Sequence, residues 1–136
     1  MKQYFNSPTA VDAHIYEGWA WVTADSQLIR LYESGTVQIM GALEGNASAL
    51  STDYRDGSCW MILETDAGKR IQKIDADGNL ICYRDDLNHA ANILSDPAGG
   101  GCIVADLEQG IVRLSSSGDI ISRYSIFYGP LGICRG

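Results

Sequence analysis

The sequence repeats one short pattern three times along the chain. In each copy a leading glycine precedes an apolar run, a second apolar run follows, and a turn glycine ends the copy. The leading glycines are Gly18, Gly57 and Gly100, and the turn glycines are Gly35, Gly78 and Gly118. Spacings of about forty residues between such copies are typical of folds in which every repeat forms one supersecondary unit. The chain is therefore expected to be an array of three similar units.

Each unit predicts four short strands. The apolar runs are rich in Ile, Leu, Val, Tyr and Trp and are separated by turn residues, which is typical of strands. We expect an all-β fold of four-stranded antiparallel blades, about three per chain, in one domain that covers residues 1–136. The expected blades are approximately 8–40, 47–83 and 91–124, with flanking strands at 2–5 and 131–134. A helical repeat is the rival, but glycine turns interrupt every run before a long helix could form.

Four-stranded units that recur at this spacing indicate a β-propeller. The third copy reads Gly-Gly-Cys-Ile-Val-Ala-Asp over 100–106 and Ile-Val-Arg-Leu over 111–114. This wording resembles NHL-type repeats, with Ile103 where those repeats usually have tryptophan. The resemblance covers nearly the whole chain, although the second copy departs from it at Met61–Asp66. It implies a propeller that serves as a non-enzymatic binding module.

Three blades are too few to close a ring, because propellers typically have four to eight. The chain is therefore expected either to be a fragment of a longer propeller or to associate with itself. Two copies would supply six blades and spare edge strands, so a homo-oligomer, with a dimer favoured, is the preferred prediction. Open blade faces would otherwise expose apolar surface and promote aggregation.

Composition limits the partners. Ten Lys and Arg against seventeen Asp and Glu give a net charge of −7, and nucleic acids and anionic membranes are bound by clustered cations. We therefore expect no nucleic-acid or membrane partner, but a protein or small-molecule ligand. The sequence shows no signal peptide and no apolar run long enough to span a bilayer. A soluble chain is expected, with the cytoplasm slightly favoured.

One face of the propeller is the candidate binding surface. In an up-and-down blade, the loops between strands two and three lie on the same face as the linkers between blades. This face is acidic and built from loops, which often carry binding residues. The candidate ligand-binding residues are Asp25, Glu44, Asn46, Asp66, Asp86, His89, Asp106 and Tyr128. The alternative is that they are ordinary solvated loop residues.

Three acid and base pairs recur around the same hairpin: Asp25 with Arg30, Asp66 with Lys73, and Asp106 with Arg113. Recurrence in every copy predicts ion pairs that stabilise the hairpin, worth little where exposed. No catalytic residue is therefore assigned, and no cofactor is expected, although carboxylates facing the channel could bind a divalent cation. The segment Asp75–Asn79 superficially resembles a calcium loop but lacks its remaining ligands, so we expect a simple turn.

Two other functions stay open. A metal-dependent lyase or hydrolase would need metal in the channel, where His89 is the available histidine. A propeller lectin would need exposed tryptophans that stack on sugars. Trp21 and Trp60 occupy equivalent positions that propellers bury, whereas Trp19 is expected to point away from Trp21. Cys59 and Cys102 also occupy equivalent positions, and we expect them to be small buried hydrophobes with free thiols.

Overall fold

The computed structural model describes residues 8–14 and 17–125, and it contains three four-stranded antiparallel sheets. The first sheet comprises β1 (Pro8–His14), β2 (Trp19–Ala24), β3 (Gln27–Tyr32) and β4 (Val37–Ala42). The second comprises β5 (Asn46–Thr52), β6 (Cys59–Thr65), β7 (Gly68–Ile74) and β8 (Leu80–Arg84). The third comprises β9 (Ala90–Asp96), β10 (Gly101–Asp106), β11 (Gly110–Leu114) and β12 (Ile120–Tyr124). The predicted all-β class of four-stranded blades is confirmed. The expected flanking strands at 2–5 and 131–134 lie outside the described residues.

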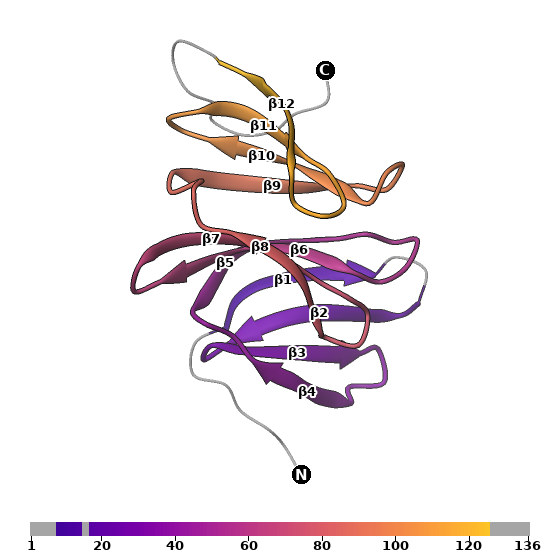
Figure 1. Cartoon of the computed structure of the whole chain (residues 1–136). Helices are drawn as coiled ribbons and strands as arrows, with labels where there is room; N and C mark the ends of the chain where they lie inside the picture. The colour runs from indigo at the N-terminus through magenta and orange to yellow at the C-terminus, as the bar shows by residue number, and fades with distance from the viewer. Residues whose placement is uncertain (1–7, 15–16, 126–136) are drawn as a thin grey trace.

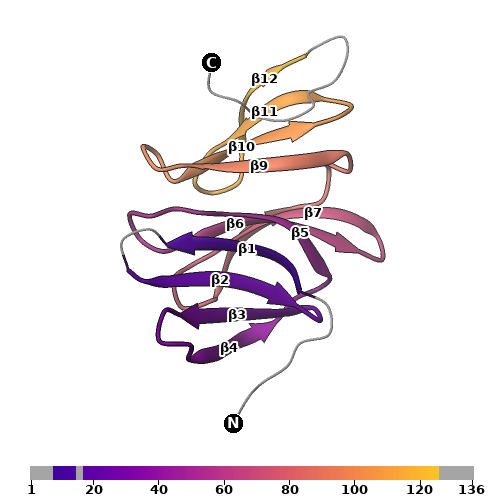
Figure 2. The same cartoon turned by 180° about the vertical axis from the view of Figure 1, so that it is seen from behind.

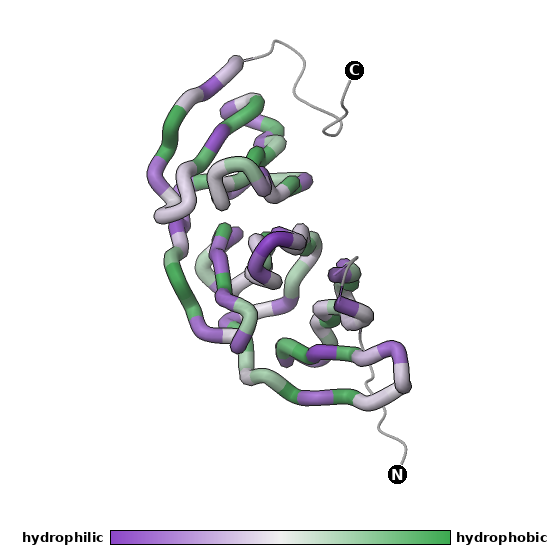
Figure 3. Tube along the Cα trace, turned by 90° about the vertical axis from the view of Figure 1, so that its right-hand side faces the viewer, coloured by the Kyte–Doolittle hydropathy of each residue, from purple (hydrophilic) through white to green (hydrophobic). Residues whose placement is uncertain are grey.

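In each sheet the spatial order of the strands follows the sequence (Figures 1 and 2), and the sheets follow one another along an arc (Figure 3). The first strands of neighbouring blades are joined by polar contacts. The Thr52 amide donates to Asp12 Oδ2 at 2.6 Å, and the Ser95 amide donates to Ser51 Oγ at 2.8 Å. Strands β1, β5 and β9 are therefore the adjoining edges of the three blades.

Two apolar clusters fill the two joints between blades. The joint between blades 1 and 2 holds Trp21, Leu28, Cys59, Met61, Leu63 and Ile74. The joint between blades 2 and 3 holds Trp60, Ile62, Ile71, Cys102, Val104, Val112 and Leu114. A sheet that packs on both faces buries both of its side-chain rows. Blade 2, which has a neighbour on each side, is accordingly the most buried blade, with β6 buried from Cys59 through Leu63.

A tryptophan hydrogen bond links each of the first two blades to the blade that follows it. The Trp21 indole N–H donates to the Gly57 carbonyl at 3.0 Å, and the Trp60 indole N–H donates to the Gly100 carbonyl at 3.2 Å. Both rings are fully buried, as predicted. The accepting glycines have φ of +77°, a conformation that side chains other than glycine rarely adopt. The leading glycine of the repeat is thus explained by a turn that requires a positive φ and presents its carbonyl to the preceding blade.

The prediction for Trp19 is wrong. Side chains two residues apart in a strand project to the same face, so Trp19 lies beside Trp21, with ring centroids 5.1 Å apart in an edge-to-face arrangement. The Arg30 guanidinium lies over both rings, 4.2 Å from the Trp19 centroid and 4.8 Å from that of Trp21. Trp19 is a half-buried part of the joint between blades.

The cysteine prediction is confirmed for the described residues. Cys59 and Cys102 are buried in the two joints, and both are free thiols, as is Cys82. Burial raises the pKa of all three thiols. Cys59 and Cys102 therefore act as small apolar groups rather than as nucleophiles or ligands.

Replacing Trp60 by Phe is expected to lower the free energy of unfolding by about 1–3 kcal/mol, because the change removes a buried hydrogen bond and leaves a cavity. Urea unfolding followed by circular dichroism measures the change. The matched control is Trp19→Phe, a half-buried ring in the other joint, which is expected to cost less. A Trp60→Phe cost no larger than that of Trp19→Phe would contradict the assigned role of this hydrogen bond.

Candidate functional site

The structure places the candidate residues on one face of the blade array. We call this the loop face: the β2–β3, β6–β7 and β10–β11 hairpins together with the linkers 43–45 and 85–89. Asp25 and Asp66 lie in hairpins, Glu44, Asp86 and His89 lie in linkers, Asn46 begins β5 and Asp106 ends β10. All are exposed except Asp106, which is fully buried. Tyr128 lies outside the described residues.

Asp106 holds the central part of the loop face together. Its Oδ1 accepts the backbone N–H of Glu108 at 2.9 Å and of Gln109 at 2.7 Å, which closes the β10–β11 hairpin. Its Oδ2 accepts the His89 backbone N–H at 3.2 Å from the linker between blades 2 and 3. A buried carboxylate that accepts three N–H donors has a structural function. Asp106 therefore positions neighbouring residues and is not itself available to a ligand.

Two sets of exposed polar contacts lie next to buried Asp106. His89 Nδ1 lies 2.7 Å from Glu108 Oε2, and both side chains are more than half exposed. The Gln109 side-chain amide donates to the Asp86 carbonyl at 2.9 Å, while the Arg84 guanidinium pairs with the Asp86 carboxylate at 2.7 and 2.8 Å. This pairing lowers the pKa of Asp86, so Asp86 is ionised at neutral pH. The structure thus brings Asp86, His89 and Asp106 into one cluster.

A second group forms at the linker between blades 1 and 2. Asp25 and Ser26 have φ of 52° and 58°, the paired positive values of a two-residue type I′ hairpin turn. Ser26 Oγ donates to Asn46 Oδ1 at 2.9 Å, and the Ser26 carbonyl accepts the Leu43 N–H at 2.8 Å. Glu44 is exposed beside a pocket of about 150 Å³ that is also lined by Arg70 and Gln72. Asp66 lies apart, at the tip of the β6–β7 hairpin.

The predicted hairpin ion pairs are wrong for Lys73 and Arg113. Lys73 Nζ donates to the Gly100 carbonyl at 2.8 Å, and Arg113 pairs with Asp96 at 2.8 Å. The equivalent Arg30 donates to the Ala76 carbonyl of the next blade. All three basic side chains are thus directed to the end of the blade opposite the loop face, where they meet turns of the same or the following blade.

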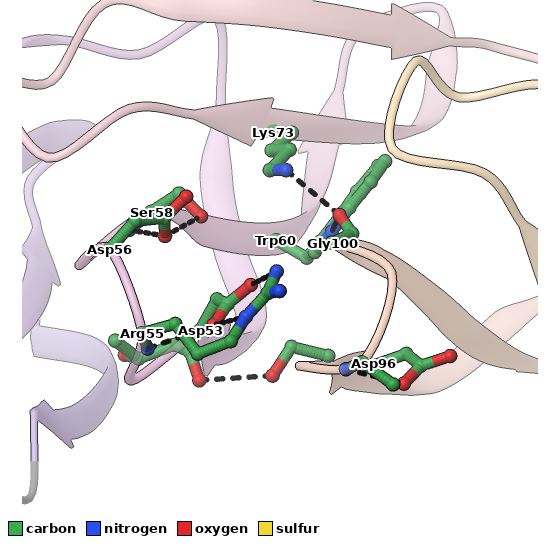
Figure 4. A network of polar contacts seen from close by, with 11 residues as sticks. Asp53, Arg55, Asp56, Ser58, Trp60, Lys73, Asp96 and Gly100 are labelled. Atoms are coloured by element: carbon green, nitrogen blue, oxygen red, sulfur yellow. Dashed lines mark hydrogen bonds and ion pairs between the residues drawn. The ribbon is translucent and has the colours of Figure 1, made fainter.

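The sequence reasoning missed a polar network at this opposite end (Figure 4). Buried Asp53 accepts two hydrogen bonds from the Arg55 guanidinium, at 3.2 and 2.9 Å. Lys73 and Trp60 both donate to the Gly100 carbonyl (Figure 4). Burial opposes ionisation of Asp56, but hydrogen bonds from Ser58 outweigh it and lower its pKa. The signal in the sequence was an acidic residue shortly before the leading glycine, at Asp53 and Asp96.

Within residues 8–14 and 17–125, no three His, Cys, Asp or Glu side chains lie close enough together to hold a metal ion. The segment that resembles a calcium loop is a turn, as predicted. Asp75 Oδ1 accepts the backbone N–H of Asp77 and of Asn79, each at 2.9 Å. In the same described part, no helix is long and apolar enough to cross a bilayer.

Comparison with solved structures identifies the architecture. Hydrazine synthase of Kuenenia stuttgartiensis superposes with a TM-score of 0.74 over 97% of this chain, at 12% identity. The WD40 repeats of RRP9 give 0.71 over 90% at 8% identity, and BamB from Moraxella catarrhalis gives 0.65 over 94% at 19% identity. The fold is a β-propeller. Identities this low establish the fold alone.

The chain spans about two-fifths of the length of these three structures, 40%, 39% and 36% respectively. No protein-family model and no curated protein matches the sequence. The solved structures support the resemblance as far as the β-propeller fold, and they do not confirm an NHL-specific repeat.

Replacing Asp106 by Asn is expected to lower the free energy of unfolding by about 1–3 kcal/mol, because an amide nitrogen cannot accept the N–H groups that one carboxylate oxygen accepts. Asp66→Asn, at an exposed hairpin tip of the same face, is the control and is expected to change stability by less than about 0.5 kcal/mol. Urea denaturation of both variants measures this. Equal stabilities would show that Asp106 does not anchor the loop face.

Proposed function

We propose that this protein is a non-enzymatic β-propeller binding module that presents its loop face to a protein or small-molecule ligand. The observation that supports this best is the contrast between the buried anchor and its exposed neighbours. Asp106 is fully buried and holds the β10–β11 hairpin against the linker, whereas His89 and Glu108 beside it are exposed. A rigid frame with accessible polar groups is the usual construction of a binding surface on a scaffold fold.

The charge of the loop face indicates the chemistry of the partner. Seven acidic side chains on this face are exposed: Asp25, Glu44, Glu64, Asp66, Asp85, Asp86 and Glu108. Three are paired with bases on the same blade, since Glu64 lies 3.6 Å from Lys69, Asp85 lies 2.8 Å from Arg70, and Asp86 pairs with Arg84. The excess of exposed carboxylates on this face, Glu44 and Asp66 among them, favours a partner with basic groups, such as a Lys- or Arg-rich segment of a protein.

We further propose that a second copy of the chain completes the ring. Apolar residues are exposed on blade 1 at Val11, Leu31 and Ile39, and on blade 3 at Leu94 and Tyr124. Blade 2 also exposes Leu80, Ile81 and Tyr83 on its outer strand β8, so the informative residue is Leu31, because its counterparts Ile74 and Leu114 are buried in the two joints inside the chain. A completed ring would enclose a central channel that opens beside the loop face.

Charge reversal tests the binding surface. Tagged wild-type chain, Glu44→Lys/Glu108→Lys on the loop face, and Asp77→Lys/Asp119→Lys on the opposite face are used to capture proteins from a lysate of the source organism, with quantification by mass spectrometry. Both double variants change the net charge equally. We expect partners that are depleted at least about tenfold on the loop-face variant and retained by the opposite-face variant, since reversed charges at a contact repel the partner.

Capture that falls equally in both variants, or only in the opposite-face variant, would contradict binding through the loop face. Raising the salt concentration provides a second readout, because screening weakens contacts between exposed charges. Partners of an acidic face are expected to be released by salt, whereas partners held by an apolar surface would be retained.

A further inference from the structure

The two joints inside the chain use the same four positions of the repeat. The preceding blade supplies a tryptophan and a base, Trp21 with Arg30 or Trp60 with Lys73. The following blade supplies a turn glycine just before its second strand and a small residue in the hairpin between its third and fourth strands. At Gly57, an added Cβ would lie 3.2 Å from Ala76 Cβ, and at Gly100 it would lie 3.4 Å from Ser116 Cβ.

Blade 1 carries the receiving half of such a joint with no described blade before it. Its turn glycine is Gly18, and the position that corresponds to Ala76 and Ser116 is Glu33, whose carboxyl carbon lies 3.1 Å from the Cβ position of Gly18. Leu31 is 38% exposed, whereas Ile74 and Leu114, which pair in the same way with the second strand of their blades, are 2% and 1% exposed.

A pocket marks the place where a preceding blade would insert a side chain. It has a volume of about 360 Å³, and its lining includes Gly18, Trp19, Ala20, Leu31 and Glu33. The residues of blade 2 that correspond to Gly18, Ala20 and Leu31 are Gly57, Cys59 and Ile74, which surround the buried Trp21 ring at the joint between blades 1 and 2. The pocket of blade 1 is thus the counterpart of an occupied site.

Blade 3 carries the inserting half of a joint, again with no described blade against it. Ile103 pairs with Arg113 as Trp60 pairs with Lys73. Ile103 is half-buried although both tryptophans in this position are fully buried. The Arg113 side chain is half exposed, while Lys73 is buried.

The two end blades are complementary in both size and charge. Glu33 folds over Gly18, in the space that a tryptophan of a preceding blade would need. Blade 3 has the shorter Ile103 at the tryptophan position, which leaves room for that carboxylate. Beside it, Arg113, which pairs with Asp96 of its own blade at 2.8 Å and is half exposed, supplies the positive charge that Glu33 would require once the joint excluded water. Neither internal joint has a carboxylate at this position, where Ala76 and Ser116 stand.

We propose that a second copy docks head to tail on this chain, with Ile103 of one copy inserted into the pocket at Gly18 and Arg113 paired with the partner's Glu33. The inference rests on the proposed completion of the ring by a second copy and specifies its contact. A head-to-tail contact closes when the rotation per subunit completes the circle. Two copies supply six blades, within the usual range of four to eight, whereas three copies would supply nine.

Charge reversal at the joint provides the test, with mass measured by light scattering across a concentration series. The wild-type chain is expected at twice the 14.8 kDa of one copy. Arg113→Glu alone and Glu33→Arg alone should each weaken dimerisation by about tenfold or more, because like charges then meet at both joints. Mixing the two single variants should restore the dimer, since a mixed pair has opposite charges at both joints.

The matched controls are Arg123→Glu on the outer strand of blade 3 and Asp77→Arg in the corresponding hairpin of blade 2, both exposed. They should leave the dimer unchanged, and circular dichroism should show all variants folded. Restoration on mixing also excludes misfolding of the single variants as the cause of their dissociation.

The outcomes separate the two levels of the proposal. A wild-type chain that stays monomeric at every concentration overturns both the completed ring and its contact. A dimer that withstands the single reversals, or is not restored on mixing, overturns the Arg113 and Glu33 contact but leaves a second copy in place. Neither result bears on partner capture by the loop face, which depends on different residues.

Discussion

The fold depends on one repeated contact, in which a buried tryptophan donates its indole N–H to the carbonyl of a turn glycine in the next blade. A four-stranded sheet has two apolar faces and cannot bury them alone, so the stability of a repeat array comes from the contacts between neighbours. Trp21 and Trp60 supply large apolar surfaces, and their hydrogen bonds fix the position of each ring. The basic residue beside each ring, Arg30 or Lys73, adds a second donor to the same joint.

As a result, the two ends of each blade have different structural roles. One end carries the hydrogen bonds from Trp21 and Trp60 to the turn glycines, together with Arg30 and Lys73 beside them. The other end, the loop face, lacks these contacts, and its exposed carboxylates surround a frame that Asp106 holds in place. The same separation explains why the acidic and basic residues of one hairpin do not meet: Lys73 contacts the next blade at Gly100, and Arg113 pairs with Asp96 of its own blade. A binding surface can then vary without disturbing the packing of the blades.

The sequence predicts the fold well because its period is visible in residues with a clear physical task. The leading glycines are required by their positive φ, and the equivalent positions of Trp21 and Trp60, or of Cys59 and Cys102, indicate equivalent buried environments. The direction of the Trp19 ring also follows from the alternation of a strand, because Trp21, two residues on, lies on the same face.

The candidate site is less predictable, because it depends on contacts between segments distant in sequence. Asp106 ends the second strand of blade 3 and Asp66 directly follows the second strand of blade 2, yet Asp106 is fully buried under backbone donors and Asp66 is exposed. The difference comes from the linker at His89, which lies against one hairpin and supplies a donor to its aspartate. Likewise, the repeat aligns Glu33 with Ala76 and Ser116 in the sequence, but only the structure shows that the Glu33 side chain lies over Gly18.

Hydrogen exchange of the tryptophan indole N–H groups, followed by NMR, tests the central contact most directly. If each blade is fastened as described, the indole protons of Trp21 and Trp60 exchange only when the whole molecule unfolds, as slowly as the most protected amides of β6 and β10. Exchange of these two protons at the rate of an exposed indole, while the β6 and β10 amides stay protected, would show that the tryptophans do not hold the blades together.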